Sequence, residues 1–261
     1  MINSIHNPQI QWIHELQARS SRRREAGAFV VEGVRLVEEA LLSGWEAECV
    51  LCSPDVSPRG RQLVDEYTKR GCKIIEVDAR VMKFASQTET PQGLLAVLKQ
   101  QKLPLRTELD FALLLDNLRD PGNLGTILRT AAAAGVQGVI LPPGMVDVWS
   151  PKVVRAAMGA HFRLPIHTLS WDEFRKTTDH QGKKLTVYLA EMETGMPYTQ
   201  VDFRHPTAIL VGGEAEGIGA QARQLVDETI HIPMPGRVES LNAAVAAGII
   251  LFEVVRQRAK E

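Results

Sequence analysis

The sequence has few cysteines, no long apolar run and no excess of charge of one sign. Its three cysteines argue against a disulfide framework. Cys49 and Cys52 form a C-x-x-C, but no second cysteine pair or nearby histidine completes a metal set, so we interpret both as structural thiols on a strand. No run approaches the ~18 apolar residues of a membrane helix, and the polar, amphipathic N-terminus lacks the apolar core of a signal peptide. The sequence therefore predicts a soluble, cytoplasmic protein.

Several common signatures of enzyme chemistry are also missing. No G-x-G-x-x-G follows a predicted strand, and neither G-x-x-x-x-G-K-[ST] nor G-x-S-x-G occurs. The histidines and cysteines show no metal-ligand spacing, so we expect no metal site. These absences argue against a dehydrogenase, a nucleoside triphosphatase, a hydrolase and a metalloenzyme.

The formal net charge is -1, so no global positive field favours a polyanionic partner. Nucleic acid would have to bind through local patches. The clearest is "ARSSRRREAG", which brings together Arg19, Arg22, Arg23 and Arg24. On charge alone we favour a solvated helix end.

Hydrophobic patterning divides the chain into two α/β parts. Residues 1–100 alternate short apolar strands with amphipathic helices, residues 101–108 are a polar linker, and residues 109–261 form a second α/β unit. Its predicted strands are 111–118, 138–141, 163–169, 185–191, 207–213 and 228–234, and its predicted helices are 123–134, 150–160, 171–178, 217–228 and 242–260. Strands this apolar predict a parallel sheet buried on both faces, whose ligands gather beyond the carboxyl ends of the strands.

The first loop at such an end is "DPGNLGTILRTAAAAG". Pro121 and Gly122 turn the chain, and Asn123 is placed to cap the helix that carries Arg129. A cap explains Asn123, but a surface charge is a poor explanation for Arg129 beside a run of alanines.

Two further loops follow later strands. In "LVGGEAEGIG" the paired glycines permit close approach of a flat ligand, and Glu214 and Glu216 argue against phosphate. A plain strand-to-helix turn explains this loop equally well. In "IPMPGRVESLNAAVAAG" the prolines and Gly236 fix an irregular loop, while Ser240 and Asn242 offer hydrogen-bonding groups at the start of an alanine-rich helix. Taken alone, this last stretch indicates a capped helix packed on a core.

The three loops in this order resemble the SpoU (TrmH) family of RNA ribose 2′-O-methyltransferases, part of the SPOUT superfamily. The resemblance rests on N-x-G-x-x-x-R from Asn123 to Arg129, G-x-E-x-x-G from Gly212 to Gly217, and I-P-M-x-G-x-x-x-S-L-N from Ile232 to Asn242. The N-terminal part is similar to the family's substrate-binding domain. Gly213 stands where family members often have Ser, Thr or Ala, which implies a looser loop.

The resemblance implies a homodimer whose catalytic domain has a deep trefoil knot and binds S-adenosylmethionine. The implied catalytic residues are Arg129, Asn123, Ser240, Asn242 and Glu214. The implied cofactor-binding residues are Gly212, Gly213, Gly217, Ile232, Met234, Gly236, Ser240 and Leu241. Because arginine stays protonated, we expect Arg129 to grip the target phosphate and hydroxyl and to stabilise negative charge, not to act as the base.

The implied partner is structured RNA, either ribosomal or transfer RNA. The resemblance makes the arginine cluster a candidate RNA contact, and the full set is Arg19, Arg22, Arg23, Arg24, Arg35, Lys152 and Arg155. Two alternatives stay open. One is a SPOUT enzyme that methylates a base nitrogen, and the other is an RNA-binding protein that keeps the fold without the reaction.

Overall fold

The computed structural model describes residues 1–179, 185–213, 217–236 and 239–259. The chain forms two compact units. Unit 1 consists of Met1–Gln101 with Asp147–Phe162, and unit 2 consists of Lys102–Val146 with Arg163–Glu261. Residues 147–162 therefore pack in unit 1, although their place in the sequence is between two strands of unit 2.

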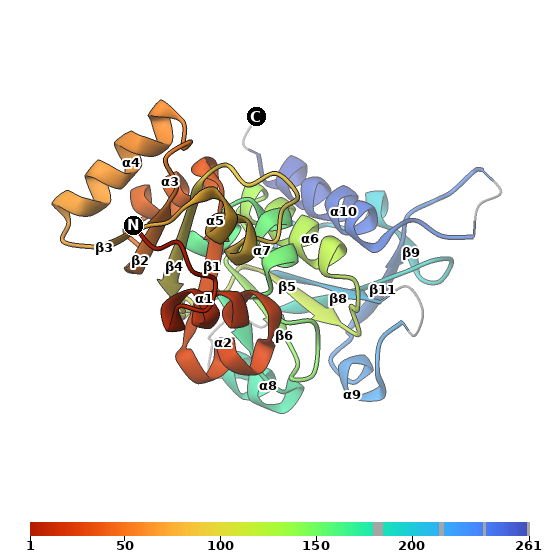
Figure 1. Ribbon diagram of the computed structural model, residues 1–261. Coiled ribbons are helices and arrows are strands. Elements are labelled where there is room, and N and C mark those ends of the chain that lie inside the picture. The colour runs from red at the N-terminus through yellow and green to blue at the C-terminus, as the bar shows by residue number, and fades with distance from the viewer. Residues whose placement is uncertain (180–184, 214–216, 237–238, 260–261) are drawn as a thin grey trace. The chain divides into compact units, whose positions relative to one another are not determined.

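The sheet of unit 1 has four strands in the order β1-β4-β2-β3 (Figure 1). Their bounds are β1 (Ala28–Glu32), β2 (Ala47–Cys52), β3 (Lys73–Glu76) and β4 (Leu94–Lys99). β4 runs antiparallel to both β1 and β2, whereas β2 and β3 are parallel. The alternation of strands and helices expected from the sequence is confirmed, in a sheet of mixed direction.

Helices of unit 1 build two separate cores on this sheet. The first core packs Ile10 and Ile13 of α1 (Pro8–Ala18) and Val81 of α5 (Ala79–Ala85) against strand residues. The second packs Leu36 and Leu63 from the other pair of helices. The remaining elements of the unit are α2 (Ser20–Ala26), α3 (Val34–Leu42), α4 (Pro58–Lys69), α7 (Pro151–Ala157) and the 3-10 turn η1 (Ala160–Phe162).

The segment from 147 to 162 enters the second core through aromatic side chains. Trp149 lies 4.7 Å from Phe29 and 5.2 Å from His161, measured between ring centroids. His161 is buried, and its Nε2 lies 2.7 Å from the carbonyl oxygen of Val148. Because a carbonyl only accepts hydrogen bonds, Nε2 carries the proton, and Nδ1 has no partner among the described residues.

This buried ring predicts a loss of stability in acid. Burial lowers the pKa of His161 from 6.5 to about 4, so the unfolded chain binds a proton that the folded chain excludes. The stability that depends on neutral His161 is complete above pH ~6.5 and declines as the pH falls toward ~4. The total loss of folding free energy over this range is about 3 kcal/mol. We expect His161→Gln to lose this part of the pH dependence in urea unfolding followed by tryptophan fluorescence. His6→Gln, at an exposed histidine, is the control, and identical pH profiles for the two variants would contradict the assignment.

Unit 2 has a seven-stranded sheet in the order β7-β6-β5-β10-β8-β11-β9. The strands are β5 (Phe111–Asp116), β6 (Gly138–Leu141), β7 (Ile166–Thr168), β8 (Thr186–Glu191), β9 (Met196–Pro197), β10 (Thr207–Gly212) and β11 (Glu228–His231). The strand pairs described in this sheet are all parallel. Every residue of β5 is buried, as an apolar strand covered on both faces requires. The parallel sheet expected from the sequence is confirmed.

Helices cover both faces of this sheet. Trp171 and Phe174 of α8 (Trp171–Asp179) and Ala222 of α9 (Ala220–Arg223) pack with the apolar side chains of one face. α10 (Ala243–Arg258) contacts both α6 (Pro121–Ala133) and β10, and Figure 1 shows the two helices side by side. The unit also has the 3-10 turn η2 (Tyr198–Gln200). Among the described residues, no helix combines the length and apolar character needed to cross a membrane.

One predicted helix of unit 2 is much shorter than expected. The sequence pattern over 217–228 predicted a helix, but the structure has helix only at Ala220–Arg223. Asp227 bonds to a strand instead of continuing a helix. Its backbone N–H donates to the carbonyl oxygen of Val187, and its carboxylate accepts from the Val187 N–H. Both bonds tie this turn to β8.

Candidate active site

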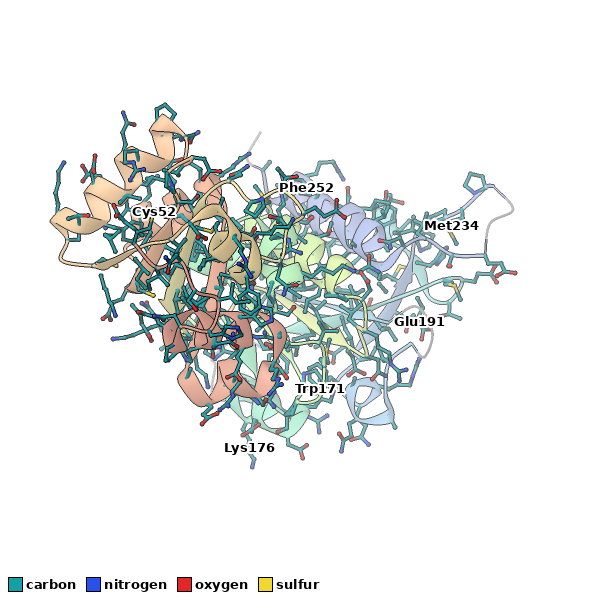
Figure 2. The ribbon with its side chains drawn as sticks, viewed as in Figure 1. Cys52, Trp171, Lys176, Glu191, Met234 and Phe252 are labelled. Carbon is teal, nitrogen blue, oxygen red and sulfur yellow. The ribbon has the colours of Figure 1, made fainter. Side chains whose placement is uncertain are left out.

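The carboxyl ends of four neighbouring strands of unit 2 meet at one edge of the sheet. These ends are Asp116 of β5, Gly212 of β10, Glu191 of β8 and His231 of β11, with Asp116 paired to Gly212 and Glu191 paired to His231. Figure 2 labels Glu191, the last residue of β8, and Met234, which belongs to the loop after β11. The three loops singled out in the sequence follow β5, β10 and β11.

The first loop leads directly into α6. Asp120 caps this helix, because its Oδ1 accepts from the Asn123 N–H at 2.7 Å. The expected cap at Asn123 is therefore wrong. Pro121 occupies the first helical position, where its fixed φ is favourable and its missing N–H costs nothing, so the acidic residue before it becomes the cap. Arg129 lies further along α6, is exposed, and makes no hydrogen bond or ion pair within the described part of the chain.

The end of β5 is tied to the loop after β10. Asp116 is 4 % exposed, and its Oδ2 accepts from the Gly219 N–H at 2.6 Å. Asn117 adopts a left-handed conformation with φ 53°, and its Nδ2 donates to Gly217 at 3.4 Å. The Gly217 N–H in turn bonds to Gly213 at 2.9 Å, which closes the loop. Glu214 lies outside the described residues.

Gly213 is required by this close approach. A Cβ at position 213 would lie 2.1 Å from the carbonyl oxygen of Asn117, and a Cβ at Gly212 would lie 2.8 Å from the backbone of Gly217. No real Cβ approaches backbone so closely. Gly213 therefore tightens the packing of the two loops, and the looser loop expected from the sequence is not what the structure has.

The third loop meets the first through two asparagines. The Nδ2 of Asn242 donates to the Oδ1 of Asn123 at 3.0 Å. The Oδ1 of Asn242 caps α10 by accepting from the Ala244 and Val245 N–H groups. Asn123 and Asn242 are thus held together although 119 positions separate them in sequence.

The irregular loop after β11 keeps hydrogen-bonding groups available. Ile232, Met234 and Leu241 are half-buried, whereas Gly236 and Ser240 are exposed. Met234, Gly236, Ser240 and Leu241 neither donate nor accept a hydrogen bond within the described part of the chain. Half-buried backbone groups without partners are suited to a ligand that offers its own donors and acceptors.

Sequence reasoning missed the loop after β8. Residues 192–195 follow β8, which lies between β10 and β11, so this loop lies between the second and third loops. Hydrogen bonding from Thr194 and the Arg223 guanidinium hold the pKa of Glu191 below its ordinary value. Gly195 has φ 82°, and a Cβ there would lie 1.9 Å from the carbonyl oxygen of Thr229. No motif marks the loop, and only its position at the end of a parallel strand indicates its importance.

The expected RNA-contacting side chains differ in their surroundings. Arg23 is 4 % exposed, and its guanidinium bonds to Asp147 at 2.6 Å and to the carbonyl oxygen of Leu16 at 2.6 Å. Arg23 is therefore not available to phosphate. Arg22 pairs with Glu15 and Glu25. The exposed members of the set are Arg19, Arg24, Arg35 and Lys152, while Arg155 is half-buried.

The cysteines are thiols in a sheet and its neighbouring turn. Cys49 and Cys52 are buried on β2, and burial raises the pKa of Cys49 to about 12. Such a thiol stays protonated at neutral pH and is a poor metal ligand or nucleophile. Among the described residues, no group of three or more His, Cys, Asp and Glu side chains is placed to hold a metal ion.

Comparison with known proteins agrees with this geometry. Residues 110–252 match the model of the SpoU rRNA Methylase family, and residues 7–96 match that of the MRM3-like substrate binding domain. The chain is 33% identical to a 23S rRNA (guanosine(2553)-2'-O)-methyltransferase, RlmP, of Bacillus subtilis, over 97% of this chain and 98% of the relative.

A vertebrate relative is longer than this chain, and a solved structure is very similar to it. Mitochondrial rRNA methyltransferase 3A of Danio rerio is 34% identical over 92% of this chain, which spans 66% of that protein. The SpoU methyltransferase AviRb of Streptomyces viridochromogenes, solved in complex with the cofactor AdoMet, superposes with a TM-score of 0.90. The two chains are 31% identical, and the match covers 97% of this chain and 98% of AviRb.

Proposed function

Since the chain belongs to the SpoU rRNA methylase family, we propose that it transfers a methyl group from S-adenosylmethionine to a ribose 2′-hydroxyl of ribosomal RNA. The observation that carries the proposal is the meeting of the three motif loops at one edge of the sheet. Asp116 and Asn117 hold the loop after β10, and Asn123 holds Asn242. The enzyme is a methyltransferase, and the loops after β8, β10 and β11 form its cofactor side.

The residues at this edge fit S-adenosylmethionine. The close packing at Gly212 and Gly213 fixes the course of the loop after β10 beside the cofactor. The backbone groups of Met234, Gly236 and Leu241, which bond to no other described residue, can hydrogen-bond to the cofactor. When bound, the cofactor supplies an electrophilic methyl group on a sulfonium cation, which needs no phosphate-binding loop. We assign Gly217, Ile232 and Ser240 to the same site.

The acceptor side is the stretch of α6 from Asn123 to Arg129. In our proposal Arg129 binds the target phosphate and hydroxyl, orients the oxygen and stabilises its developing negative charge. Asn123, Ser240, Asn242 and Glu214 complete the catalytic set. The RNA phosphate or water accepts the proton of the ribose 2′-hydroxyl, because the guanidinium stays protonated and cannot act as a base.

Unit 1 contributes RNA affinity through exposed basic side chains in this proposal. Arg19, Arg24 and Arg35 are exposed and are suited to phosphate, and Lys152 and Arg155 on α7 extend the set. Arg22 is held by two carboxylates and contributes less.

Charge reversal tests this surface. The double variant Arg19→Glu with Arg24→Glu is expected to weaken RNA binding while cofactor affinity is unchanged. The slope of log affinity against log salt concentration should become shallower by the amount that corresponds to about one lost phosphate contact for each arginine. Filter binding over a salt series measures both quantities. Arg59→Glu is the control, since Arg59 is exposed on α4 and paired with Glu38. If the double variant bound RNA as tightly as the control, the arginine cluster would be a solvated helix end without a role in RNA binding.

We also propose a homodimer formed through α10. Val245 and Phe252 on this helix are 51% and 48% exposed, and Ile249 lies between them at helical spacing. An apolar stripe of this kind is typical of an interface between identical subunits.

Sedimentation tests the dimer. Phe252→Arg places a charge on the stripe and is expected to shift the protein from dimer to monomer. Leu42→Arg is the control because Leu42 is 72% exposed on α3, outside the stripe. The same sedimentation coefficient for Phe252→Arg and wild type would contradict the interface.

The proposal includes a trefoil knot and a cytoplasmic location. Support for the knot comes from β11, which lies between β8 and β9 although both precede it in the chain. Support for the location comes from the three free cysteines, which suit a reducing compartment.

Mapping of 2′-O-methyl sites and of methylated bases in total RNA, from cells with and without the gene, tests the function. We expect one site in ribosomal RNA to be lost and to be restored by purified protein with S-adenosylmethionine. A lost base methylation would instead assign a base nitrogen as acceptor. Failure to bind the cofactor and to methylate any RNA would identify a silent RNA-binding protein.

A further inference from the structure

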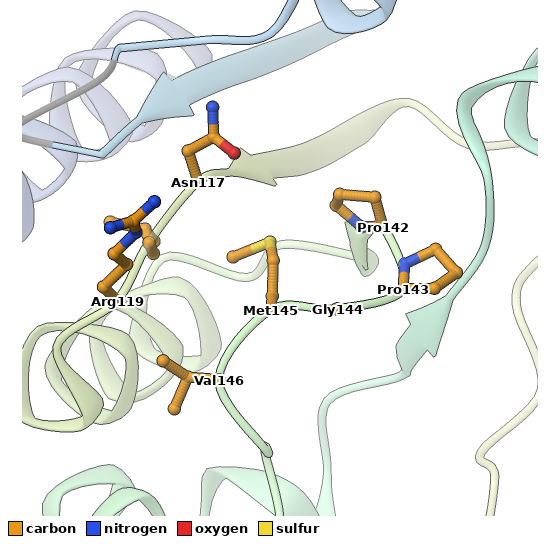
Figure 3. Close-up of a pocket in the computed structure, with 8 residues that line it drawn as sticks. Asn117, Arg119, Pro142, Pro143, Gly144, Met145 and Val146 are labelled. Atoms are coloured by element: carbon orange, nitrogen blue, oxygen red, sulfur yellow. The ribbon is translucent and has the colours of Figure 1, made fainter.

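A cleft opens at the carboxyl ends of β5 and β6 in unit 2. Its volume is about 420 Å³, and residues 117–119 and 142–146 line it. In Figure 3 the side chain of Met145 projects from the 142–146 loop toward Arg119. The volume is at the small end of the range for sites that bind small molecules, and it is ample for a planar ring.

The cleft lies on the acceptor side of the sheet. β5 separates β6 from β10, whereas the cofactor loops follow β10, β8 and β11 on the other side. Asn117 marks the boundary, because it lines the cleft while its Nδ2 donates to Gly217 of the cofactor loop. α6, which carries Arg129, begins two residues after Arg119.

The lining combines flat apolar surface with a few polar groups. Pro142, Pro143 and Met145 offer apolar surface for stacking, and the lining also includes the polar side chains of Asn117 and Arg119. The described residues that line the cleft include no acidic side chain. Proteins recognise unstacked RNA bases by stacking them on flat side chains, most often aromatic rings or Arg, and by hydrogen bonds to the base edge. In this cleft Pro142, Pro143 and Met145 supply the stacking surface.

Building on the proposed function, we propose that this cleft holds the base of the nucleotide whose ribose is methylated. Met145 stacks on the base and Arg119 faces its edge, which makes both residues determinants of substrate choice. With the base in the cleft, the attached ribose lies toward the start of α6, between Arg129 and the cofactor loops.

Steady-state kinetics on an RNA fragment that contains the mapped target tests the assignment. Met145→Trp fills the cleft and is expected to raise KM for RNA by about tenfold, with cofactor affinity measured by calorimetry unchanged. Met145→Ala removes the stacking surface without filling the cleft and is expected to raise KM less. Met196→Trp is the matched control, because Met196 lies on β9, the outermost strand on the side of the sheet away from β6.

A target lacking its base separates base binding from simple obstruction. We expect the wild type to bind an RNA with an abasic target about tenfold more weakly than the intact RNA, and Met145→Trp to bind both equally. Wild-type KM for Met145→Trp, or a loss of cofactor affinity, would overturn the assignment while leaving the function intact. Absence of methyl transfer to any RNA by the wild type would overturn the proposed function itself.

Discussion

Replacing Arg129 with alanine is expected to lower kcat about a thousandfold while leaving the dissociation constant for S-adenosylmethionine within about twofold. Arg129 is exposed on α6 and bonds to no other described residue, so its loss removes no structural contact. The cofactor loops follow other strands and keep their contacts. The effect therefore falls on the transition state, where the ribose oxygen gains negative charge.

Two further variants sharpen this test. Arg129→Lys keeps the charge but loses the planar fork that binds phosphate at two points, so we expect it to recover only part of the rate. Arg204→Ala is the matched control, because Arg204 is an exposed arginine of unit 2 whose partner is Asp202. Equal losses of turnover and cofactor affinity in Arg129→Ala would show that Arg129 supports the cofactor site.

Replacing Arg23 with methionine is expected to lower the free energy of unfolding by about 3 kcal/mol. The guanidinium donates to Asp147 and to the carbonyl oxygens of Leu16 and Gln17. Methionine fills the space of the side-chain stem but leaves the Asp147 carboxylate and both carbonyls without this donor. Because the carboxylate is partly exposed, the expected cost is at the lower end of the range for broken buried pairs.

Urea unfolding measures this cost against two references. Arg24→Met, at the exposed neighbouring arginine, is expected to change stability by less than about 0.5 kcal/mol. Asp147→Asn keeps an oxygen for the Trp149 N–H, and its effect combined with Arg23→Met is expected to be smaller than the sum of the two. Equal stability of the Arg23 and Arg24 variants would show that the buried pair contributes nothing.

Much of the secondary structure followed from the pattern of apolar residues. β5, β6, β8 and β10 lie where apolar runs predicted strands, because a strand buried on both faces needs apolar residues throughout. The helix predicted over 217–228 was the clearest error. Its residues suit a helix locally, but hydrogen bonds to Val187 in a distant strand decide their conformation.

The candidate site was predictable as a set of motifs but not as a set of contacts. The order of the three motifs indicated the family, which the comparisons confirm. The pairing of Asn123 with Asn242, and the contact of Gly213 with Asn117, join residues about 100 or more positions apart. Local sequence contains no signal for such contacts, and the loop after β8 has no motif at all.

The sequence by itself determined the alternation of strands and helices, the parallel sheet and the family, because each depends on local periodicity or on short motifs. Only the tertiary structure decided that residues 147–162 belong to unit 1, that Arg23 is a buried ion-pair partner, and that Asp120 caps α6. The physical reason is that burial and pairing depend on neighbours brought from elsewhere in the chain. The sequence pattern around Arg23 is typical of a surface charge, but in the fold Asp147 pairs with its guanidinium and the side chain is buried.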